Sequence, residues 1–391
     1  MGNRGVSRNR IDLMLLLPVV VLLVIGLMMV YSATFVLGDD LFYYLKQQML
    51  WAVAGATALG SMAQVDYRRW RTFALPIMSA AVLLLCVVLA VGHRVGNAQS
   101  WLLKGRVQPS EFAKLAFIIY IAAWLASRGD QIRDVTYGLI PFSILLGAVT
   151  GLIVLQPDLG AAVLVIVTAV SMFFIAGAEI SQLAVGLLAG IPALWGIVAT
   201  WDYARTRVLT FLHPESDVQG AGYQVHAILT ALRMGGLFGR GLGAGTQKFI
   251  EPWVHHTDTI FAVIGEELGL IGCLIVIGLF TFFAYRGLLT SFRAPDTFGT
   301  LLALGITCWI LVQTLVHMAV NTATLPFTGL TLPFISYGGS SLVTCMAGVG
   351  ILLNISRASV QKERKSVAAF AFGWRNRRPR LSSTRRRRGM E

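Results

Sequence analysis

Long apolar stretches alternate with short polar ones along most of the chain. The first extends from Ile11 to about Phe35, and runs such as Leu13–Val30 lack the alternation of a membrane β-strand. Because a helix needs about 20 apolar residues to cross about 30 Å of hydrocarbon, each such stretch predicts a membrane-spanning helix. The ten predicted spans are residues 11–35, 46–64, 73–91, 110–127, 137–155, 159–178, 181–200, 259–285, 298–322 and 336–356.

Composition supports this reading. Hydrophobic residues make up 56% of the chain and charged residues 13%, with a mean hydropathy of +0.70, which is typical of a membrane protein. The first stretch is too long for the core of a secretion signal, so it is expected to be retained. We therefore predict an all-α integral membrane protein with about ten transmembrane helices. The four cysteines all lie in apolar stretches and are predicted to be small core residues.

Basic residues predict the orientation of the chain. If residues 1–10 form a cytoplasmic tail, 22 of the 32 Lys and Arg residues lie on the cytoplasmic side, as the positive-inside rule expects. Ten spans then place both termini there. Residues 11–356 form the membrane domain, and the basic residues 357–391 are predicted to be a disordered tail that contacts lipid head groups. A protein contact is the alternative, whereas nucleic-acid binding is not expected.

The only long connection between predicted spans, residues 201–258, faces outward in this orientation. It carries Arg205 and Arg207 and is rich in glycine. Long ordered loops are usually functional, and we expect short helices lying on the membrane surface within it, for instance at Tyr223–Met234. A second outer loop, residues 92–109, holds Trp101.

Ionisable residues inside or beside spans cost about 2.5–3.5 kcal/mol each at mid-helix on insertion scales, so they mark functional candidates. Pro109 and Ser110, after Gln108, suit the start of a helix. Glu111 and Lys114 are three positions apart and can pair on one helix face. They form either a structural ion pair or the charged wall of a cavity for a lipid substrate.

A second polar group, Gln156-Pro157-Asp158, separates two apolar stretches with almost no room for a loop. Proline ends a helix, and the freed backbone groups need partners. Asp158 either caps the next helix in a tight re-entrant turn or takes part in binding a cation or a substrate.

The third group, His255 to Asp258, ends the long loop at the outer surface. Asp258 is either the N-cap of the following helix or a general base, close to His256 and the loop arginines. Adjacent histidines do not share a helix face, so no zinc site is predicted. One of Glu266 and Glu267, about two turns deeper, is expected to face the interior of the bundle.

Small and hydroxyl-bearing residues, including Ser336, fill residues 332–341 before the last span. They either permit close helix packing or line the rim of a cavity. The sequence contains no P-loop, dinucleotide fingerprint or HExxH motif. Chemistry driven by ATP within this chain is therefore not expected.

Several short motifs follow one another in a fixed order. They are Tyr31-Ser32-Ala33, Trp101, QPSEFAK at 108–114, QPDLG at 156–160, Arg207 before residues 211–214, GAGYQ at 220–224, GLFGRGLG at 236–243, HTDTIFAVIGEELGLIG at 256–272 and LPFTGLTLPFISYGGSS at 325–341. In this order they make residues 11–356 resemble the SEDS family (shape, elongation, division and sporulation), the polytopic peptidoglycan polymerases that include FtsW and RodA. The sequence of residues 328–341 is more similar to FtsW and its sporulation relatives than to RodA.

The resemblance implies a SEDS-type bundle with one long extracellular loop, which polymerises glycan strands from lipid II and a lipid-linked glycan. The 4-hydroxyl of the lipid II N-acetylglucosamine would attack the anomeric carbon of the donor, and undecaprenyl pyrophosphate would leave. Asp258 matches the family's essential aspartate, the proposed base. Arg205, Arg207 or Lys114 would hold the charge of the pyrophosphate. Further expected substrate contacts are Trp101, Gln108, Ser110, Glu111, Asp158, His256, Thr257, Glu267 and Ser336.

The resemblance implies no certain cofactor; it allows for a divalent cation, Mg²⁺ or Mn²⁺, but no ligand set demands one. The expected partners are a transpeptidase of the penicillin-binding class and other divisome or elongasome proteins, in a bacterial inner (plasma) membrane. The competing hypothesis is a lipid II flippase. No inverted repeat with paired broken helices supports it. A scaffold for division proteins would leave the polar outer clusters unexplained.

Overall fold

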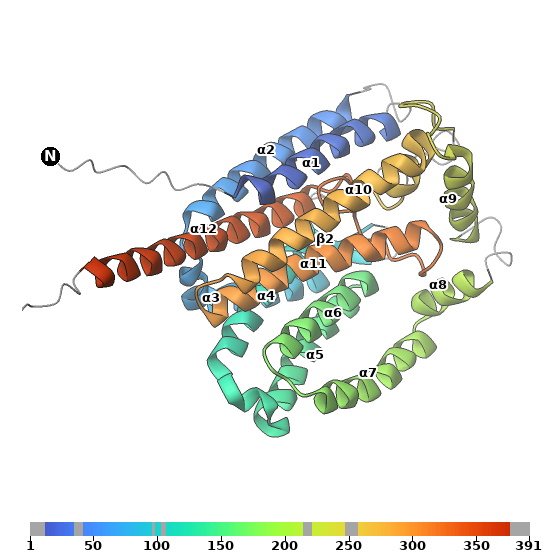
Figure 1. Ribbon diagram of the computed structural model, residues 1–391. Coiled ribbons are helices and arrows are strands. Elements are labelled where there is room, and N and C mark those ends of the chain that lie inside the picture. The colour runs from blue at the N-terminus through green and yellow to red at the C-terminus, as the bar shows by residue number, and fades with distance from the viewer. Residues whose placement is uncertain are drawn as a thin grey trace, which may run out of the picture.

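The computed structural model describes residues 12–34, 42–95, 98–102, 107–213, 221–246 and 257–375. They form a bundle of long helices (Figure 1). The elements are α1 (Leu13–Thr34), α2 (Tyr43–Gln64), α3 (Tyr67–Val91), β1 (His93–Val95), β2 (Ala98–Trp101), α4 (Pro109–Arg128), the 3-10 turn η1 (Gly129–Arg133), the π-helical turn η2 (Val135–Leu139), α5 (Ile140–Val154), α6 (Leu159–Ile175), α7 (Ile180–Thr200), α8 (Asp202–Leu212), α9 (Ala221–Gly235), α10 (Ile260–Phe292), α11 (Thr297–Asn321) and α12 (Gly339–Arg375).

A helix lies at each of the ten predicted spans. In the described part of the chain, eight helices are long and apolar enough to cross a membrane. Of the other two predicted spans, α6 has only 17 residues, and α2 carries the polar run Lys46 to Gln48 near its start. The all-α class is confirmed. A short antiparallel hairpin, β1–β2, adds two strands in the second outer loop.

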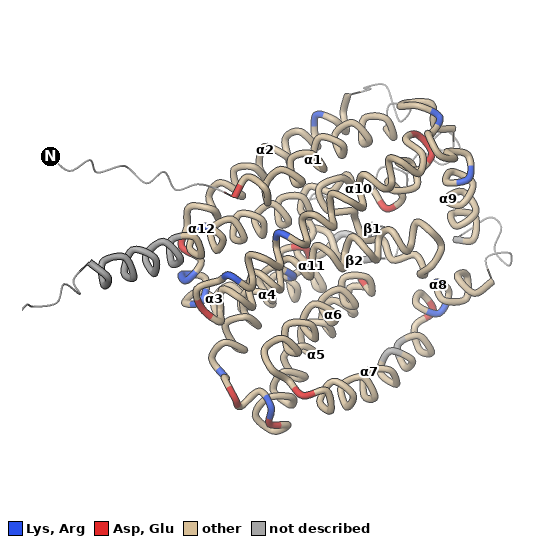
Figure 2. Tube along the Cα trace, viewed as in Figure 1, with Lys and Arg blue, Asp and Glu red and all other residues tan. Residues whose placement is uncertain are grey.

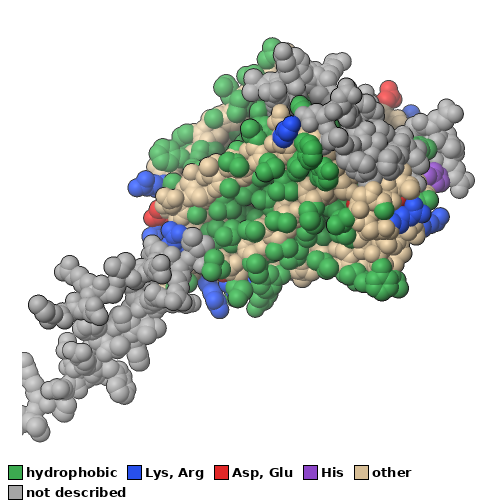
Figure 3. Space-filling view, turned by 90° about the horizontal axis from the view of Figure 1, so that it is seen from above, with side chains coloured by type: hydrophobic (Ala, Val, Ile, Leu, Met, Phe, Trp, Pro, Cys, Tyr) green, Lys and Arg blue, Asp and Glu red, His purple; other side chains and the backbone are tan. Residues whose placement is uncertain are grey.

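The helices α11 and α12 lie at the centre, and α7 lies at the edge of the bundle beside α6 and α8 (Figure 1). Small residues allow the central helices to approach closely, as expected in membranes. A side chain on Gly350 of α12, for example, would begin 2.4 Å from the carbonyl oxygen of Leu59 in α2. The outer surface carries a broad hydrophobic band between charged ends (Figure 3), which is the pattern of a protein surrounded by lipid.

Ion pairs connect the helices at the end of the bundle that is predicted to be cytoplasmic. Arg286 of α10 lies 2.6 Å from Asp12 before α1, and Arg68 of α3 lies 3.2 Å from Asp296 before α11. Figure 2 shows that most charged residues gather toward the helix ends. Asp258 lies at the end opposite these pairs.

Two predictions about the remaining sequence need correction. The helix α12 continues to Arg375, so residues 357–375 are helical rather than disordered. Ala, Gln, Glu, Lys and Arg are good helix formers and extend a helix that already exists; residues 376–391 lie outside the described residues. All four cysteines are free, but Cys86 is exposed, because an apolar surface of a membrane protein faces lipid as well as core.

Candidate active site

Asp258 lies in the turn before α10, and it is not the N-cap of that helix. Thr259 occupies the N-cap position, without a side-chain capping bond. Asp258 is half-buried. Burial raises the pKa of its carboxyl to about 6, although the charge of Arg207 and a hydrogen bond with Thr257 lower it. The alternative in which Asp258 merely caps α10 is therefore wrong, and its pKa suits a general base.

Arg207 of α8 is held between two aromatic rings. Its guanidinium carbon lies 4.6 Å from the ring centre of Tyr203 and 5.4 Å from that of Phe327, and the guanidinium donates to the carbonyl oxygen of Phe327. Such contacts hold an arginine without neutralising its charge. Arg205 is exposed, because two positions along a helix turn a side chain by about 200°. The structure thus brings Arg207, but not Arg205, toward Asp258.

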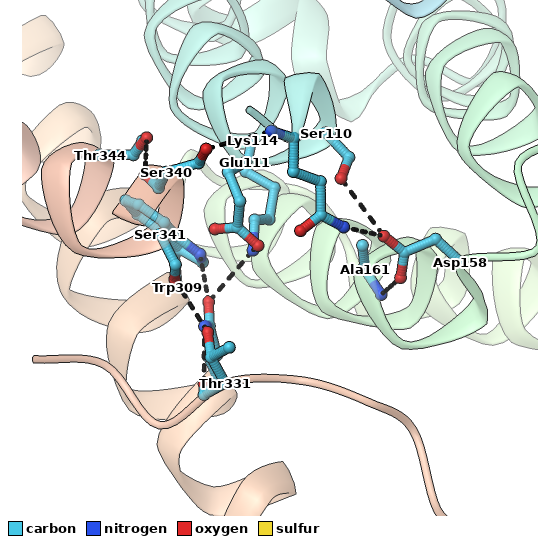
Figure 4. A network of polar contacts seen from close by, with 12 residues as sticks. Ser110, Glu111, Lys114, Asp158, Ala161, Trp309, Thr331, Ser340, Ser341 and Thr344 are labelled. Atoms are coloured by element: carbon cyan, nitrogen blue, oxygen red, sulfur yellow. Dashed lines mark hydrogen bonds and ion pairs between the residues drawn. The ribbon is translucent and has the colours of Figure 1, made fainter. Parts of the chain in front are cut away.

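Asp158 closes the break between α5 and α6 (Figure 4). One carboxylate oxygen accepts from the amide of Ala161 at 3.1 Å, and the other accepts from Gln108 Nε2 at 3.2 Å and from Ser110 Oγ at 3.3 Å. The predicted cap is confirmed. Burial raises the pKa of the Asp158 carboxyl, and the charge of Asp158 raises the pKa of Asp258. Both acids therefore belong to one site.

Glu111 and Lys114 form a buried ion pair in the first turns of α4. Lys114 Nζ lies 2.8 Å from Glu111 Oε1, and the two side chains are 1% and 7% exposed respectively. Lys114 also donates to Gln313 Oε1 at 3.3 Å and faces the ring of Trp309 (Figure 4). The structure favours the structural ion pair over the charged cavity wall. A buried, paired lysine is a poor ligand for a pyrophosphate at the surface.

The segment between α11 and α12, residues 322–338, supports the turn that carries Asp258. Ser336 Oγ accepts from the amide of Leu332 at 2.8 Å and donates to the carbonyl oxygen of Thr257 at 2.7 Å. The same segment supplies Phe327, which contacts Arg207. Ser336 is buried, so it holds the turn instead of lining the rim of a cavity.

Glu266 and Glu267 are both buried, whereas one was expected to face the interior. Glu267 accepts from Ser32 Oγ at 2.6 and 2.7 Å and from the amide of Gly243 at 3.1 Å. Glu266 accepts from the amide and the hydroxyl of Thr246 at 2.6 and 3.0 Å. Two carboxylates thus anchor the glycine-rich segment 236–246 against α10.

The same segment, residues 236–246, forms hydrogen bonds with backbone groups at a break in α10. Gly269 has φ of 67°, which interrupts the helix. The carbonyl oxygen of Glu266 accepts from the amide of Arg240 at 3.0 Å, and the amide of Leu270 donates to the carbonyl oxygen of Gly236 at 2.9 Å. These bonds replace those lost at the break. Residues 260–268 therefore form a short half-helix, and Asp258 lies at its N-terminal end.

Two further predicted substrate contacts are Trp101 and His256. Trp101 lies half-buried on β2, and no contact within the described residues joins it to Asp258. His256 lies outside the described residues.

Several residues that shape the site escape the sequence analysis. Tyr203 lies four positions before Arg207, a spacing that puts the two side chains on one face of a helix, whereas nothing in the sequence marks Phe327 as a neighbour of Arg207. Gln313, His317 and Asn321 are spaced by four in the otherwise apolar α11. This spacing puts polar groups on one helix face, and it is the signal that identifies them.

Among the residues that the structure describes, no three His, Cys, Asp or Glu side chains gather in a way that would hold a metal ion. Asp158 is the carboxylate whose negative charge raises the pKa of Asp258.

Comparison with known proteins identifies the class. A family model described as "Cell cycle protein", which covers FtsW, RodA and SpoVE, matches residues 13–361. The chain belongs to this family, and it is a multi-pass membrane protein and a peptidoglycan glycosyltransferase.

Individual relatives agree with this assignment. The chain is 40% identical to a probable peptidoglycan glycosyltransferase FtsW of Trichlorobacter lovleyi, over 88% of this chain and 93% of the relative. It is 39% identical to the stage V sporulation protein E of Bacillus subtilis, over 89% and 97%. The predicted similarity to FtsW and its sporulation relatives is therefore confirmed.

Solved structures share the fold. A chain from a structure described as "Structural coordination of polymerization and crosslinking by a peptidoglycan synthase complex" matches with a TM-score of 0.75 and 29% identity, over 90% of this chain and 99% of that one. The rod shape determining protein RodA of Thermus thermophilus matches with a TM-score of 0.66 and 28% identity, over 89% and 97%.

Proposed function

We propose that Asp258 is the general base in the polymerisation of glycan strands from lipid II. The carboxylate takes the proton of the 4-hydroxyl on the lipid II N-acetylglucosamine. That oxygen forms a bond to the anomeric carbon of the lipid-linked glycan, and the bond from this carbon to the pyrophosphate oxygen breaks. The leaving group is undecaprenyl pyrophosphate.

The observation that carries the proposal is the environment of one carboxyl. Burial raises the pKa of Asp258 to about 6, so the group is mostly ionised at neutral pH yet basic enough to take a proton. A positioned base of this kind contributes about 10²–10⁴-fold to a rate. Asp258 also lies in a turn at the end of the bundle. A substrate bound there can keep its sugar in water and its lipid tail in the bilayer.

Arg207 is proposed to hold the departing pyrophosphate. The Arg207 charge acts on Asp258, and the rings of Tyr203 and Phe327 fix its guanidinium. A fixed cation stabilises charge as it develops on the leaving group, and a guanidinium matches phosphate oxygens in pairs. Arg205 and Lys114 are not assigned this role, since the first is exposed and the second is paired in the interior.

The site is proposed to face the outside of a bacterial inner membrane, with both termini in the cytoplasm. The support is the position of Arg68 and Arg286 at the end opposite Asp258, together with the excess of basic residues in the connections at that end. Lipid II and the growing glycan are the proposed substrates.

A transpeptidase of the penicillin-binding class is the proposed partner, with other membrane proteins of the divisome or elongasome around it. The support is the similarity to a chain from a peptidoglycan synthase complex that coordinates polymerisation and crosslinking. Enzyme for the tests below is therefore purified with its cognate partner.

A divalent cation, Mg²⁺ or Mn²⁺, remains a prediction. Asp158 and Asp258 are hard oxygen donors of the type such ions prefer, and these ions often complete their coordination with water and substrate phosphates. The two carboxylates would hold the ion, and it would supply further positive charge to the pyrophosphate. The roles of Asp258 as base and Arg207 as cation do not depend on it.

The test uses labelled lipid II in detergent, where movement across a bilayer has no meaning. Asp258→Asn is expected to lower polymerisation at least about 100-fold, while lipid II still binds. Asp202→Asn, which changes an exposed carboxylate at the start of α8, is the matched control and should keep wild-type activity. Full activity of Asp258→Asn would refute the proposed base. A wild-type protein that makes no polymer but moves lipid II across vesicles would favour the flippase.

A further inference from the structure

Asn321, the last residue of α11, connects that helix to the turn that carries Asp258. Its Nδ2 donates to the carbonyl oxygens of Asp258 and His317, both at 2.9 Å, and its Oδ1 accepts from the amide of Ala262 at 3.3 Å. The side chain is 0% exposed. A flipped amide would place Oδ1 against two carbonyl oxygens, so the partners fix its orientation.

Asn321 supplies a cap that α10 does not make for itself. The side chain of an N-cap residue usually accepts a hydrogen bond from the second or third amide of its helix. Thr259 occupies the N-cap position and makes no such bond. The amide of Ala262, the third residue of α10, donates to the carbonyl oxygen of Thr259 at 2.9 Å and also to Oδ1 of Asn321 at 3.3 Å, so Asn321 provides the side-chain cap. Because the cap comes from another helix, the carboxylate of Asp258 is not required for it.

Two consecutive peptide groups of the turn are held by buried side chains. Ser336 donates to the carbonyl oxygen of Thr257 at 2.7 Å, and Asn321 donates to that of Asp258 at 2.9 Å. The backbone at Asp258 is thereby attached both to α11 and to the segment before α12. The side chain of Asp258 therefore extends from a backbone that is fixed on both sides of the residue.

We propose that Asn321 is a positioning residue for the reaction: it fixes the backbone of Asp258 and so places the carboxylate against the acceptor hydroxyl. This inference rests on the proposed role of Asp258 as the base. A displacement of about 1 Å at a reacting group costs on the order of 100-fold in rate. Loss of the Asn321 bonds should therefore slow the chemical step while substrate binding stays the same.

The chain contains a matched control for a buried asparagine. Asn354 of α12 donates to the carbonyl oxygen of Ala63 at 3.0 Å and accepts from the amide of Tyr67 at 2.9 Å. It ties a turn between two helices in the same way, but at the end of the bundle opposite Asp258. A purely structural effect of losing such bonds should be equal at the two positions.

The experiment compares Asn321→Leu, Asn321→Asp and Asn354→Leu in the purified complex with its partner. Asn321→Leu removes every bond. Asn321→Asp keeps the acceptor for the amide of Ala262 but lacks the two amide donors. This variant provides the comparison if Asn321→Leu does not fold. For each variant, kcat, KM for lipid II, the midpoint of the acidic limb of the rate and the melting temperature in detergent are measured.

The expected result is a fall in kcat of about 10–100-fold in both Asn321 variants, with KM within about threefold of wild type and the acidic midpoint displaced. Asn354→Leu should melt earlier but keep its kcat and its midpoint. Wild-type kcat in Asn321→Leu, or an equal fall in Asn354→Leu, would overturn the inference. Full activity of Asp258→Asn would instead refute the proposed base itself, so the two failures are distinguishable.

Discussion

The charge of Arg207 lowers the pKa of Asp258, against a burial effect that raises it. The two residues come from opposite ends of the long loop. The rings of Tyr203 and Phe327 hold the guanidinium in place. Arg207 therefore stays near Asp258 without a direct ion pair, which would occupy both charged groups. In the proposed mechanism this arrangement leaves Arg207 for the pyrophosphate and Asp258 for the proton.

Asp258→Asn should make the folded protein more stable at neutral pH while it removes activity. The carboxyl has a pKa of about 6 in the folded protein, against an ordinary value of 3.8. The folded state therefore favours the protonated form, and stability falls as the pH rises from about 4 to about 6 and then levels off. A neutral amide avoids this loss.

Melting temperatures in detergent at pH 5 and pH 7.5 check this prediction. The gain of Asp258→Asn over wild type should be larger at pH 7.5, and the exposed control Asp202→Asn should show no such pattern. A lower melting temperature of Asp258→Asn at pH 7.5 would contradict the burial argument.

Arg207→Lys should lower kcat/KM for lipid II by about 10–100-fold, because an ammonium lacks the planar, paired donors of a guanidinium and stacks less well on aromatic rings. Arg205→Lys changes an exposed arginine on the same helix and should have little effect. Steady-state polymerisation in detergent gives both values. Equal losses in the two variants would contradict a special role for the guanidinium held between the two rings.

Lys114→Met should destabilise the protein by about 3–5 kcal/mol, since it leaves the Glu111 carboxylate buried without its cation. The double variant Lys114→Met with Glu111→Gln removes both charges and should recover most of this loss. Reversible unfolding in mixed detergent measures the free energies. Should the double variant be less stable than Lys114→Met alone, the pair would have a role beyond mutual neutralisation.

Gly269→Ala should destabilise the half-helix that carries Asp258, by about 1–3 kcal/mol for the backbone conformation alone. Gly269 has φ of 67°, and a side chain there would begin 2.3 Å from the amide nitrogen of Gly239. Gly278→Ala lies in the same helix with open space around it and serves as the control. Thermal unfolding of the two variants gives the comparison; indistinguishable curves would argue against the break as a fixed feature.

The helical architecture could be predicted from the sequence because membrane spans depend on length and apolarity, which are read directly from the chain. The same reasoning located Asp258 at a helix start and paired Glu111 with Lys114, since both depend on short separations. The helical extension of α12 was missed, because a charged tail has the composition of disorder as well as that of a helix.

Contacts between distant segments could not be predicted. The contact of Phe327 with Arg207, the cap that Asn321 provides and the anchoring of residues 236–246 by Glu266 and Glu267 all join residues from separate segments of the chain. They depend on how the helices pack, and no local pattern specifies that. The exposure of Arg205 depends on α8 being a helix whose inner face carries Arg207, and the sequence alone does not specify which face is inner.

The pH dependence of kcat/KM, which reports the pKa values of the free enzyme, tests the central claim most directly. With a pKa of about 6, Asp258 should be about nine-tenths ionised at pH 7 and about one-tenth at pH 5, so kcat/KM should fall through an acidic limb centred near pH 6. Arg207→Gln removes a charge that lowers this pKa and should move the limb to higher pH. A rate that stays flat from pH 5 to pH 8, or a limb that Arg207→Gln leaves in place, would contradict the assignment of Asp258 as the base.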